Sequence, residues 1–192
     1  TSGIKNMDYL FSDYNLIYDE EEKYYFEKVK KFKNIWNCHS GFSFNRNLIP
    51  QPSLKNNIFT FGSFNNFTKI SKENLNCWEK ILKTSNNSRL ILKSSIDYFP
   101  EYLSDQFKKR GIIDQIKLLT KTSTFKEHID MYDQIDLALD TFPYTGVTTT
   151  FEALWKSVPV LTLKGYNFKS RCGYSIIKNI GIDYLIAEDV DE

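Results

Sequence analysis

The sequence predicts an α/β fold built on a doubly wound parallel sheet. From Ile58 onward, short aliphatic or β-branched runs alternate with amphipathic stretches, and the amphipathic stretches carry helix start and stop signals. This alternation is typical of parallel strands joined by helices that cover both faces of a sheet. Six strands are expected, at residues 58–61, 89–93, 116–119, 135–140, 158–163 and 184–187.

Two helices are expected after the first and second strands. Residues 72–83 place apolar side chains such as Trp78 on one helical face, and they follow Ser71, whose hydroxyl suits the N-cap position. Residues 98–110 repeat the amphipathic spacing and stop at Gly111, a residue that adopts the left-handed conformation past a helix end at little cost. Both helices are therefore expected to pack against the sheet.

Two further helices are expected later in the chain. Thr124 and Glu127 form the pattern of a capping box, in which each side chain accepts a hydrogen bond from the other residue's backbone N–H, so a helix is predicted at 125–134. Residues 171–180 have a similar apolar spacing and end at Gly181.

The first fifty residues differ in composition from the rest. Residues 19–32 are highly charged and are expected to form an amphipathic helix, and residues 34–50 are aromatic, polar and rich in turn formers. We therefore expect residues 1–50 to be a helical tail and linker from a preceding domain, and residues 51–192 to be the main lobe. The missing initial Met and the charged end at 188–192 lead us to expect a piece of a longer protein.

The composition excludes several classes of protein. The 25 basic and 24 acidic residues leave a net charge of +1, so we expect no binding to nucleic acid or to a membrane through bulk charge. No apolar run reaches the about 20 residues of a membrane span, and no signal sequence is recognisable. Three distant cysteines suggest neither a disulfide framework nor a zinc site. A soluble, cytoplasmic protein is expected.

The junction at residues 140–155 is the strongest candidate site in the sequence. An apolar strand runs through a turn with Pro143 and Gly146 into a helix that opens on three threonines, of which Thr148 and Thr149 come first. The backbone N–H groups at a helix start lack intrahelical partners and carry partial positive charge, so this junction suits a phosphate. The plainer alternative is that one threonine caps the helix. Glu152, one turn further on, is placed to accept hydrogen bonds from ribose hydroxyls.

Two other loops also follow expected strands. The loop at 61–69 offers Asn66 and Lys69, whose ammonium group suits a phosphate; the alternative is a solvated turn. The loop at 121–128 offers His128 and the backbone near Ser123 to a nucleobase; the alternative is a surface histidine. The carboxyl ends of parallel strands share one edge of a sheet, so these loops are expected to lie near one another.

Other nucleotide-binding and metal-binding patterns are missing. The sequence contains no G-x-G-x-x-G and no G-x-x-x-x-G-K-[ST], which disfavours a dinucleotide-dependent dehydrogenase and a P-loop ATPase. Its two histidines are far apart, and no acidic cluster has the spacing of metal ligands. No metal site is expected.

At these same positions the chain resembles the catalytic region of the protein O-GlcNAc transferase family, which includes bacterial relatives and the plant Spindly proteins. The resemblance follows the family's order over nearly the whole chain. It is carried by residues 1–3, 7–9, 61–66, 69–70, 88–90, 92–93, 127–128, 136–140, 142–144, 148–152, 154–155, 158–160 and 170–171.

The resemblance implies a GT-B glycosyltransferase, in which two Rossmann-like lobes face each other across the active site. Residues 51–192 would be the C-terminal lobe that binds the nucleotide sugar, incomplete at its C-terminus, and residues 1–50 the tail of the N-terminal catalytic lobe. The missing N-terminal lobe, helical repeats and a protein acceptor are the implied partners.

Residue by residue, the resemblance implies how UDP-GlcNAc is held. Lys69 and the helix start at Thr148 and Thr149 would bind the diphosphate, with Asn66 beside it, while His128 would contact uracil. In the same way, Glu152 would hold the ribose. Lys69 would act catalytically by stabilising the departing diphosphate without a metal ion or another cofactor. The implied reaction is inverting transfer of the sugar to a Ser or Thr hydroxyl by direct displacement.

The chain departs from the family at several positions. Phe125 and Met131 stand where animal members have Lys and Arg, and Val147 replaces a histidine. The family's histidines near the acceptor have no counterpart in these 192 residues, so the chain alone is not expected to catalyse transfer. Two alternatives remain: a GDP-fucose-using protein O-fucosyltransferase of the Spindly type, and a non-catalytic relative that keeps the fold for interaction.

Overall fold

The computed structural model of the chain describes residues 2–44, 47–93 and 98–192, so Thr1 of the resembling segment 1–3 lies outside them. Within these residues the strands form a six-stranded sheet and a separate two-stranded sheet. All pairs are parallel. The six-stranded sheet has the order β5-β4-β3-β6-β7-β8 and consists of β3 (Phe59–Ser63), β4 (Ser88–Lys93), β5 (Ile116–Leu119), β6 (Leu137–Leu139), β7 (Val160–Leu163) and β8 (Ile186–Ala187).

This strand order confirms the predicted doubly wound sheet. From β3 the chain first moves outward through β4 to β5, then returns to β6 beside β3 and moves outward the other way. The expected strands are present, but β6 and β7 begin two residues later than expected, and the expected strand at 184–187 is reduced to β8 after a 3-10 turn, η6 (Asp183–Leu185). Asp136 lies directly before β6, and its side chain accepts hydrogen bonds from the backbone N–H groups of Thr60 and Ser53.

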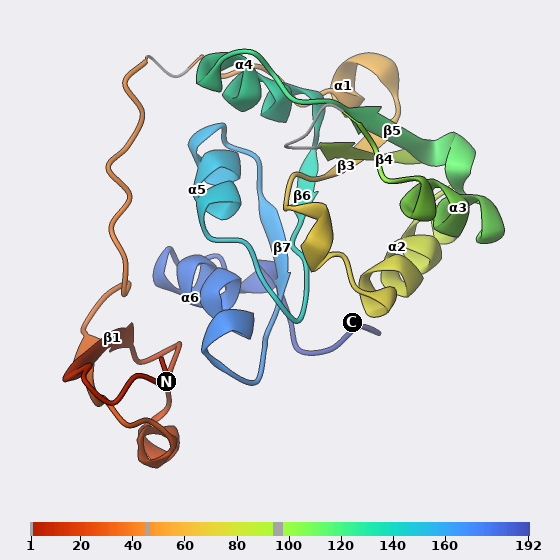
Figure 1. Cartoon of the computed structure of the whole chain (residues 1–192). Helices are drawn as coiled ribbons and strands as arrows, with labels where there is room; N and C mark the ends of the chain where they lie inside the picture. The colour runs from red at the N-terminus through yellow and green to blue at the C-terminus, as the bar shows by residue number, and fades with distance from the viewer. Residues whose placement is uncertain (1, 45–46, 94–97) are drawn as a thin grey trace.

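Helices cover both faces of the large sheet (Figure 1). On one face, α2 (Lys72–Thr84) and α3 (Glu101–Lys109) pack against Leu90, Leu92 and Leu139. On the other face, the core joins residues of α4 (Phe125–Asp130), α5 (Thr148–Trp155) and α6 (Cys172–Asn179) to Ile91, Ala138 and Val160. Successive residues of a strand point to opposite faces, so each central strand contributes to two hydrophobic cores.

The predicted helix boundaries are largely confirmed. Ser71 caps α2, Thr124 and Glu127 form the capping box of α4, and Gly111 and Gly181 have the left-handed φ values of 69° and 74°. The helix expected over 125–134 ends at Asp130 and continues as η4 (Met131–Gln134).

The helix predicted after the second strand starts later than expected. It was placed at 98–110, but α3 begins at Glu101, directly after Pro100. A proline disfavours the helical conformation of the residue before it, so Phe99 cannot extend the helix backwards. The remaining short elements are α1 (Ser53–Asn56), η2 (Phe67–Lys69), η3 (Ile113–Gln115) and η5 (Phe168–Ser170).

The expected helix at 19–32 is wrong. The structure has a 3-10 helix, η1 (Asp19–Tyr24), followed by a strand, β2 (Lys28–Phe32), that pairs with β1 (Tyr9–Asp13). In β2, exposed residues alternate with half-buried ones, which is the period of a strand. Val29 lies opposite Leu10, and both pack on a small core around Leu16. Tertiary pairing therefore overrides the helix propensity of the charged residues.

A partly buried ion pair joins this N-terminal unit, residues 8–36, to the large lobe. The guanidinium of Arg171, before α6, donates to both carboxylate oxygens of Glu21, at 2.6 and 2.8 Å. Arg171 also donates to the carbonyls of Leu16 and Gly165, and the residue is only 5% exposed. Such a fork-shaped pair fixes orientation as well as distance.

Asp13 forms a second connection. Its Oδ2 accepts hydrogen bonds from the hydroxyl of Ser175, on α6, at 2.5 Å and from the backbone N–H of Trp36 at 3.0 Å. Its Oδ1 accepts from the N–H groups of Asn15 and Leu16. The side chain is therefore shared by the end of β1, the following turn, the linker and α6.

In the described residues, no helix is both long and apolar enough to cross a bilayer.

Arg171→Met is expected to lower the free energy of unfolding by about 3 kcal/mol, because it leaves Glu21 without its main partner in a partly buried position. Urea denaturation measures this. The matched control is Lys164→Met, which breaks an exposed pair with Glu188 and should cost about 0.5 kcal/mol or less. Equal losses in both variants would contradict the prediction.

The pH dependence of the same pair provides a further readout. The hydrogen bonds from Arg171 hold the pKa of Glu21 below its ordinary value of 4.5. This contribution to stability is present above pH 4.5 and is lost as pH falls through the lowered pKa. Arg171→Met should lack this acid-sensitive component.

Candidate functional site

The reversal of strand order places the candidate site between β3 and β6. Ligands of open parallel sheets bind outside the carboxyl ends of the strands at such a reversal. Here the loop that follows β3 and the loop at 141–147 that follows β6 leave the sheet side by side, since β3 and β6 are hydrogen-bonded neighbours. Both loops were selected from the sequence as phosphate-binding candidates.

Lys69 connects the two loops. It ends the short helix η2, and its ammonium group donates to the carbonyl oxygen of Thr145 at 2.9 Å. The same nitrogen lies 4.2 Å from the centre of the Tyr144 ring. Burial lowers the pKa of Lys69, and the negative charge of Asp140 partly offsets this effect. A half-buried ammonium group held by a carbonyl and an aromatic face is positioned to receive an anion.

The two asparagines after β3 have different surroundings. Asn66, the residue selected from the sequence, is exposed, and its Oδ1 caps η2 by accepting from the backbone N–H of Thr68. Asn65 is only 6% exposed and joins both loops, because it donates to Asp140 and accepts from the hydroxyl of Thr149 at 3.0 Å. Asn65 is therefore a candidate that the sequence reasoning missed.

The start of α5 has the form expected of an anion site. Val147 occupies the N-cap position and makes no side-chain capping bond, and the hydroxyl of Thr149 is directed to Asn65. Thr148 is exposed at the first helical position. A Cβ at Gly146 would lie 2.4 Å from the Thr149 hydroxyl, so only glycine fits there. The capping alternative for the threonines is thus not what the structure shows.

His128 and Glu152 lie together on two adjacent helices. The Nε2 of His128, on α4, is 2.9 Å from Oε2 of Glu152, on α5. The same oxygen accepts a hydrogen bond from the hydroxyl of Tyr132 at 2.8 Å, and Glu152 is only 3% exposed. Lys93, at the end of β4, lies close enough for the Glu152 charge to act on its pKa, which burial lowers overall.

This cluster differs in detail from the sequence expectation. His128 was expected to face a nucleobase and Glu152 a ribose, and the structure places them in contact with each other. Ser123, whose surroundings were expected to contribute to the base site, is exposed, and its backbone N–H donates to Glu127 at 2.9 Å. Tyr132 and Lys93 were not selected from the sequence. The sequence did offer a signal for Lys93, because it is a charged residue directly after the apolar run 90–92.

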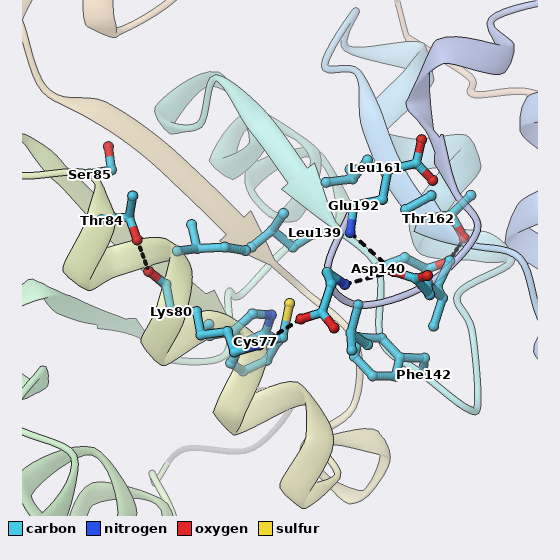
Figure 2. Close-up of a pocket in the computed structure, with 17 residues that line it drawn as sticks. Cys77, Lys80, Thr84, Ser85, Leu139, Asp140, Phe142, Leu161, Thr162 and Glu192 are labelled. Atoms are coloured by element: carbon cyan, nitrogen blue, oxygen red, sulfur yellow. Dashed lines mark hydrogen bonds and ion pairs between the residues drawn. The ribbon is translucent and has the colours of Figure 1, made fainter.

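A groove lies on the α2 side of β6 and β7, the face of the sheet opposite α5 (Figure 2). It has a volume of about 500 Å³, and its walls are mostly apolar. Figure 2 shows Cys77 and Lys80 from α2 across from Leu161 and Thr162 of β7. The ammonium of Lys80 is already paired with Asp191 at 2.8 Å. Such a lining suits apolar groups rather than a phosphate.

In the ranges that the structure describes, no group of three or more His, Cys, Asp or Glu side chains is arranged to hold a metal ion. The expectation of a metal-independent reaction remains a prediction.

The comparison with known proteins identifies the family. The sequence profile of glycosyl transferase family 41 matches residues 47–192. The chain belongs to glycosyl transferase family 41. This agrees with the resemblance to O-GlcNAc transferases and Spindly proteins, and the family places the six-stranded sheet as the C-terminal lobe of a GT-B glycosyltransferase.

Family 41 relatives match along the whole chain. It is 31% identical to a probable UDP-N-acetylglucosamine–peptide N-acetylglucosaminyltransferase SPINDLY of Solanum lycopersicum, over 100% of this chain and 21% of that protein. It is 26% identical to the corresponding probable transferase SEC of Arabidopsis thaliana, with the same coverage. The chain therefore spans about a fifth of the length of these curated relatives.

Solved structures agree with this family fold. A mutant O-GlcNAc transferase from Thermobaculum terrenum superposes with a TM-score of 0.87 at 29% identity, covering 98% of this chain and 36% of that one. TarM superposes with a TM-score of 0.53 at 12% identity, covering 88% of this chain and 36% of its own, which supports the fold alone.

Tyr132→Phe should lower the free energy of unfolding of this family 41 lobe by about 1–2 kcal/mol, because the buried Glu152 carboxylate loses a hydrogen-bond donor. Chemical denaturation measures the change. Tyr184→Phe serves as the control, since Tyr184 is 82% exposed and its hydroxyl should contribute nothing measurable. If both variants unfold like the parent chain, the Tyr132–Glu152 bond does not stabilise the cluster.

Proposed function

We propose that this chain is the lobe of a protein O-glycosyltransferase that binds the donor, and that the donor is UDP-GlcNAc. The observation that carries the proposal is the position of Lys69. Its ammonium group reaches from the loop after β3 to the carbonyl of Thr145, three residues before the uncapped start of α5 and at the reversal of the strand order. Cationic and N–H donors then converge where an open parallel sheet binds its ligand.

In the proposed reaction, these donors act on the leaving group. The anomeric carbon of GlcNAc exchanges its bond to the diphosphate oxygen for a bond to the oxygen of a Ser or Thr hydroxyl, with inversion, and the hydroxyl proton is released to solvent. Negative charge grows on the diphosphate as the bond breaks. The Lys69 ammonium and the N–H groups at Thr148 and Thr149 would stabilise that charge without a divalent metal ion. Lys69 is therefore the catalytic residue of the proposal, and Asn66 lies in the same loop.

The nucleoside is assigned to the neighbouring cluster. The bond between His128 and Glu152 fixes the imidazole ring beside Phe125, whose ring centre is 6.0 Å away. We propose that the base lies against His128 near Ser123 and that the ribose reaches the α5 side, where Glu152 is located. The diphosphate and nucleoside positions are then joined by α5, which carries both Thr149 and Glu152.

Two other functions remain in competition. A GDP-fucose-using protein O-fucosyltransferase of the Spindly type would need the same diphosphate contacts, and the relatives at 30–31% identity carry the Spindly name. A non-catalytic relative would keep the fold and bind no donor. The protein acceptor, an N-terminal lobe, helical repeats and a cytoplasmic location stay predictions, as do the domain division at residue 50 and the exclusion of nucleic acid and membranes as partners.

Lys69→Ala should weaken binding of UDP to the 192-residue chain by about 10- to 150-fold, the equivalent of one charge-assisted hydrogen bond of about 1.5–3 kcal/mol. Isothermal titration calorimetry gives the dissociation constants. Lys109→Ala removes the same charge from an exposed position on α3 and should bind as the parent does. Thr149→Val should also weaken binding, whereas Thr149→Ser should not. Unchanged affinity in Lys69→Ala would reject the phosphate assignment.

A comparison of UDP with GDP distinguishes the three functions. With UDP at 100 times its dissociation constant, the folded state gains about 2.7 kcal/mol, which a thermal melt detects as a higher melting temperature. We expect the rise with UDP, and the same rise in EDTA as in Mg²⁺. Tighter binding of GDP would favour the fucosyltransferase. If neither nucleotide changes the melting temperature, the non-catalytic relative is favoured.

A further inference from the structure

The carboxylate of Asp140 is hydrogen-bonded to the loop at 141–147, whose Thr145 carbonyl accepts the hydrogen bond from Lys69. Asp140 follows β6 and is only 7% exposed. Its Oδ1 accepts hydrogen bonds from the backbone N–H of Thr141 at 2.9 Å and of Gly146 at 2.6 Å. One oxygen atom thus joins both ends of the loop at 141–147.

The remaining contacts of Asp140 connect this loop to its surroundings. Oδ1 also receives the amide of Asn65 at 3.3 Å, and Oδ2 receives the hydroxyl of Thr162, on β7, at 2.9 Å. A Cβ at Gly173, on α6, would lie 2.2 Å from Oδ2, so the carboxylate occupies space that a side chain there would need. Residues that follow β3 and β6, and a residue within β7, all donate hydrogen bonds to this one carboxylate.

The same contacts set the position of the groups assigned to the diphosphate. Gly146 leads into α5, and Thr145, the residue before it, offers the carbonyl that receives Lys69. The side chain of Asn65 bridges Asp140 and Thr149, because its amide nitrogen donates to Asp140 and its amide oxygen accepts from the Thr149 hydroxyl. The loop carbonyl and the helix start therefore share a single anchor.

We propose that Asp140 is a positioning residue of the donor site, which closes the loop at 141–147 so that Lys69 and the start of α5 converge on the diphosphate. The inference rests on the proposed function for its ligand. It adds a residue that need not touch the donor and that acts through Gly146 and Asn65.

Asp140 is also expected to respond to a bound anion. Burial raises its pKa from 3.8 to about 6, although its hydrogen bonds and the Lys69 charge oppose this rise. Lys69 and Cys172 interact electrostatically with it, and burial raises the pKa of the Cys172 thiol to about 12, which keeps it neutral. Asp140 also lines the groove of Figure 2, whose other titratable side chains are Cys77, Lys80, Asp189, Asp191 and Glu192. The hydroxyl of Thr162 is able to donate to the ionised carboxylate or to accept from the protonated one, so the loop contacts at Oδ1 persist in both states.

The first test compares two buried aspartates that flank the same strand. Asp136 precedes β6, is 2% exposed and accepts bonds from the N–H groups of Ser53 and Thr60, at the end of the sheet away from the site. Asp140→Ala should weaken UDP-GlcNAc binding to the chain by about 10-fold or more, and Asp136→Ala by less than about twofold. Equal losses in both variants, or no loss in Asp140→Ala, would overturn the proposal.

The second test uses Asp140→Asn, which keeps the shape and the acceptor oxygen and mimics the protonated acid. Each phosphate of a nucleotide sugar has one ester bond and one anhydride bond and therefore lacks the second, weakly acidic hydroxyl, so the ligand's phosphates do not titrate near pH 6. Because the negative donor disfavours an ionised Asp140, the ratio of dissociation constants, parent over Asp140→Asn, should be near one at pH 5. It should rise by about threefold or more as pH increases through 6. Every other titratable group, His128 included, is present in both proteins, so its effect on binding cancels in the ratio of dissociation constants. A constant ratio would contradict the inference.

The third test needs no ligand and separates this inference from the proposed function. Amide hydrogen exchange at Gly146 should be slow in the parent, in Asp140→Asn and in Asp136→Asn, and faster by about 10-fold or more in Asp140→Ala if that variant folds. If the parent binds no nucleotide sugar, the donor assignment fails, and exchange at Gly146 still decides whether Asp140 closes the loop. Protection that persists in Asp140→Ala would reject that role.

Discussion

The hydrogen bond from the Lys69 ammonium to the Thr145 carbonyl is the interaction on which the architecture of the site depends. It joins two loops that are more than 70 residues apart in sequence and meet only because β3 and β6 are neighbours in the sheet. A lysine in an exposed turn would be a solvated charge. Here the ammonium is half-buried and held by the carbonyl of Thr145, three residues before α5, and by the aromatic ring of Tyr144.

The strand segments along the chain and the helix caps were predictable because their signals are local. Ser71, Thr124 with Glu127, and Gly111 each act through their own backbone neighbours, and the structure confirms all three. The strand β2 was not predictable in this way. Its partner β1 and the ion pair between Glu21 and Arg171 are distant in sequence, so charge patterning alone favoured a helix there.

In the candidate site, too, some contacts were predictable from the sequence and others depend on the packing of the folded chain. Lys69 and the threonines of α5 were selected because loops after parallel strands converge, and the structure brings these loops together. Asn65 was passed over for Asn66, since nothing local distinguishes a buried asparagine from an exposed one beside it. Tyr132 lies in the interior between α4 and α5, where its hydroxyl meets Glu152. Only the packing of the two helices reveals that contact.

The space beside Asp140 has a consequence for how the family's sequences vary. A methyl group at position 173 would overlap the Asp140 carboxylate, which leaves no room for independent change at the two positions. During evolution they should vary together: a side chain at 173 becomes tolerable only in a lineage where residue 140 has shortened and the Thr162 hydroxyl, 2.6 Å from that Cβ, has also given way. Such a lineage would have to secure the loop over β6 by other means.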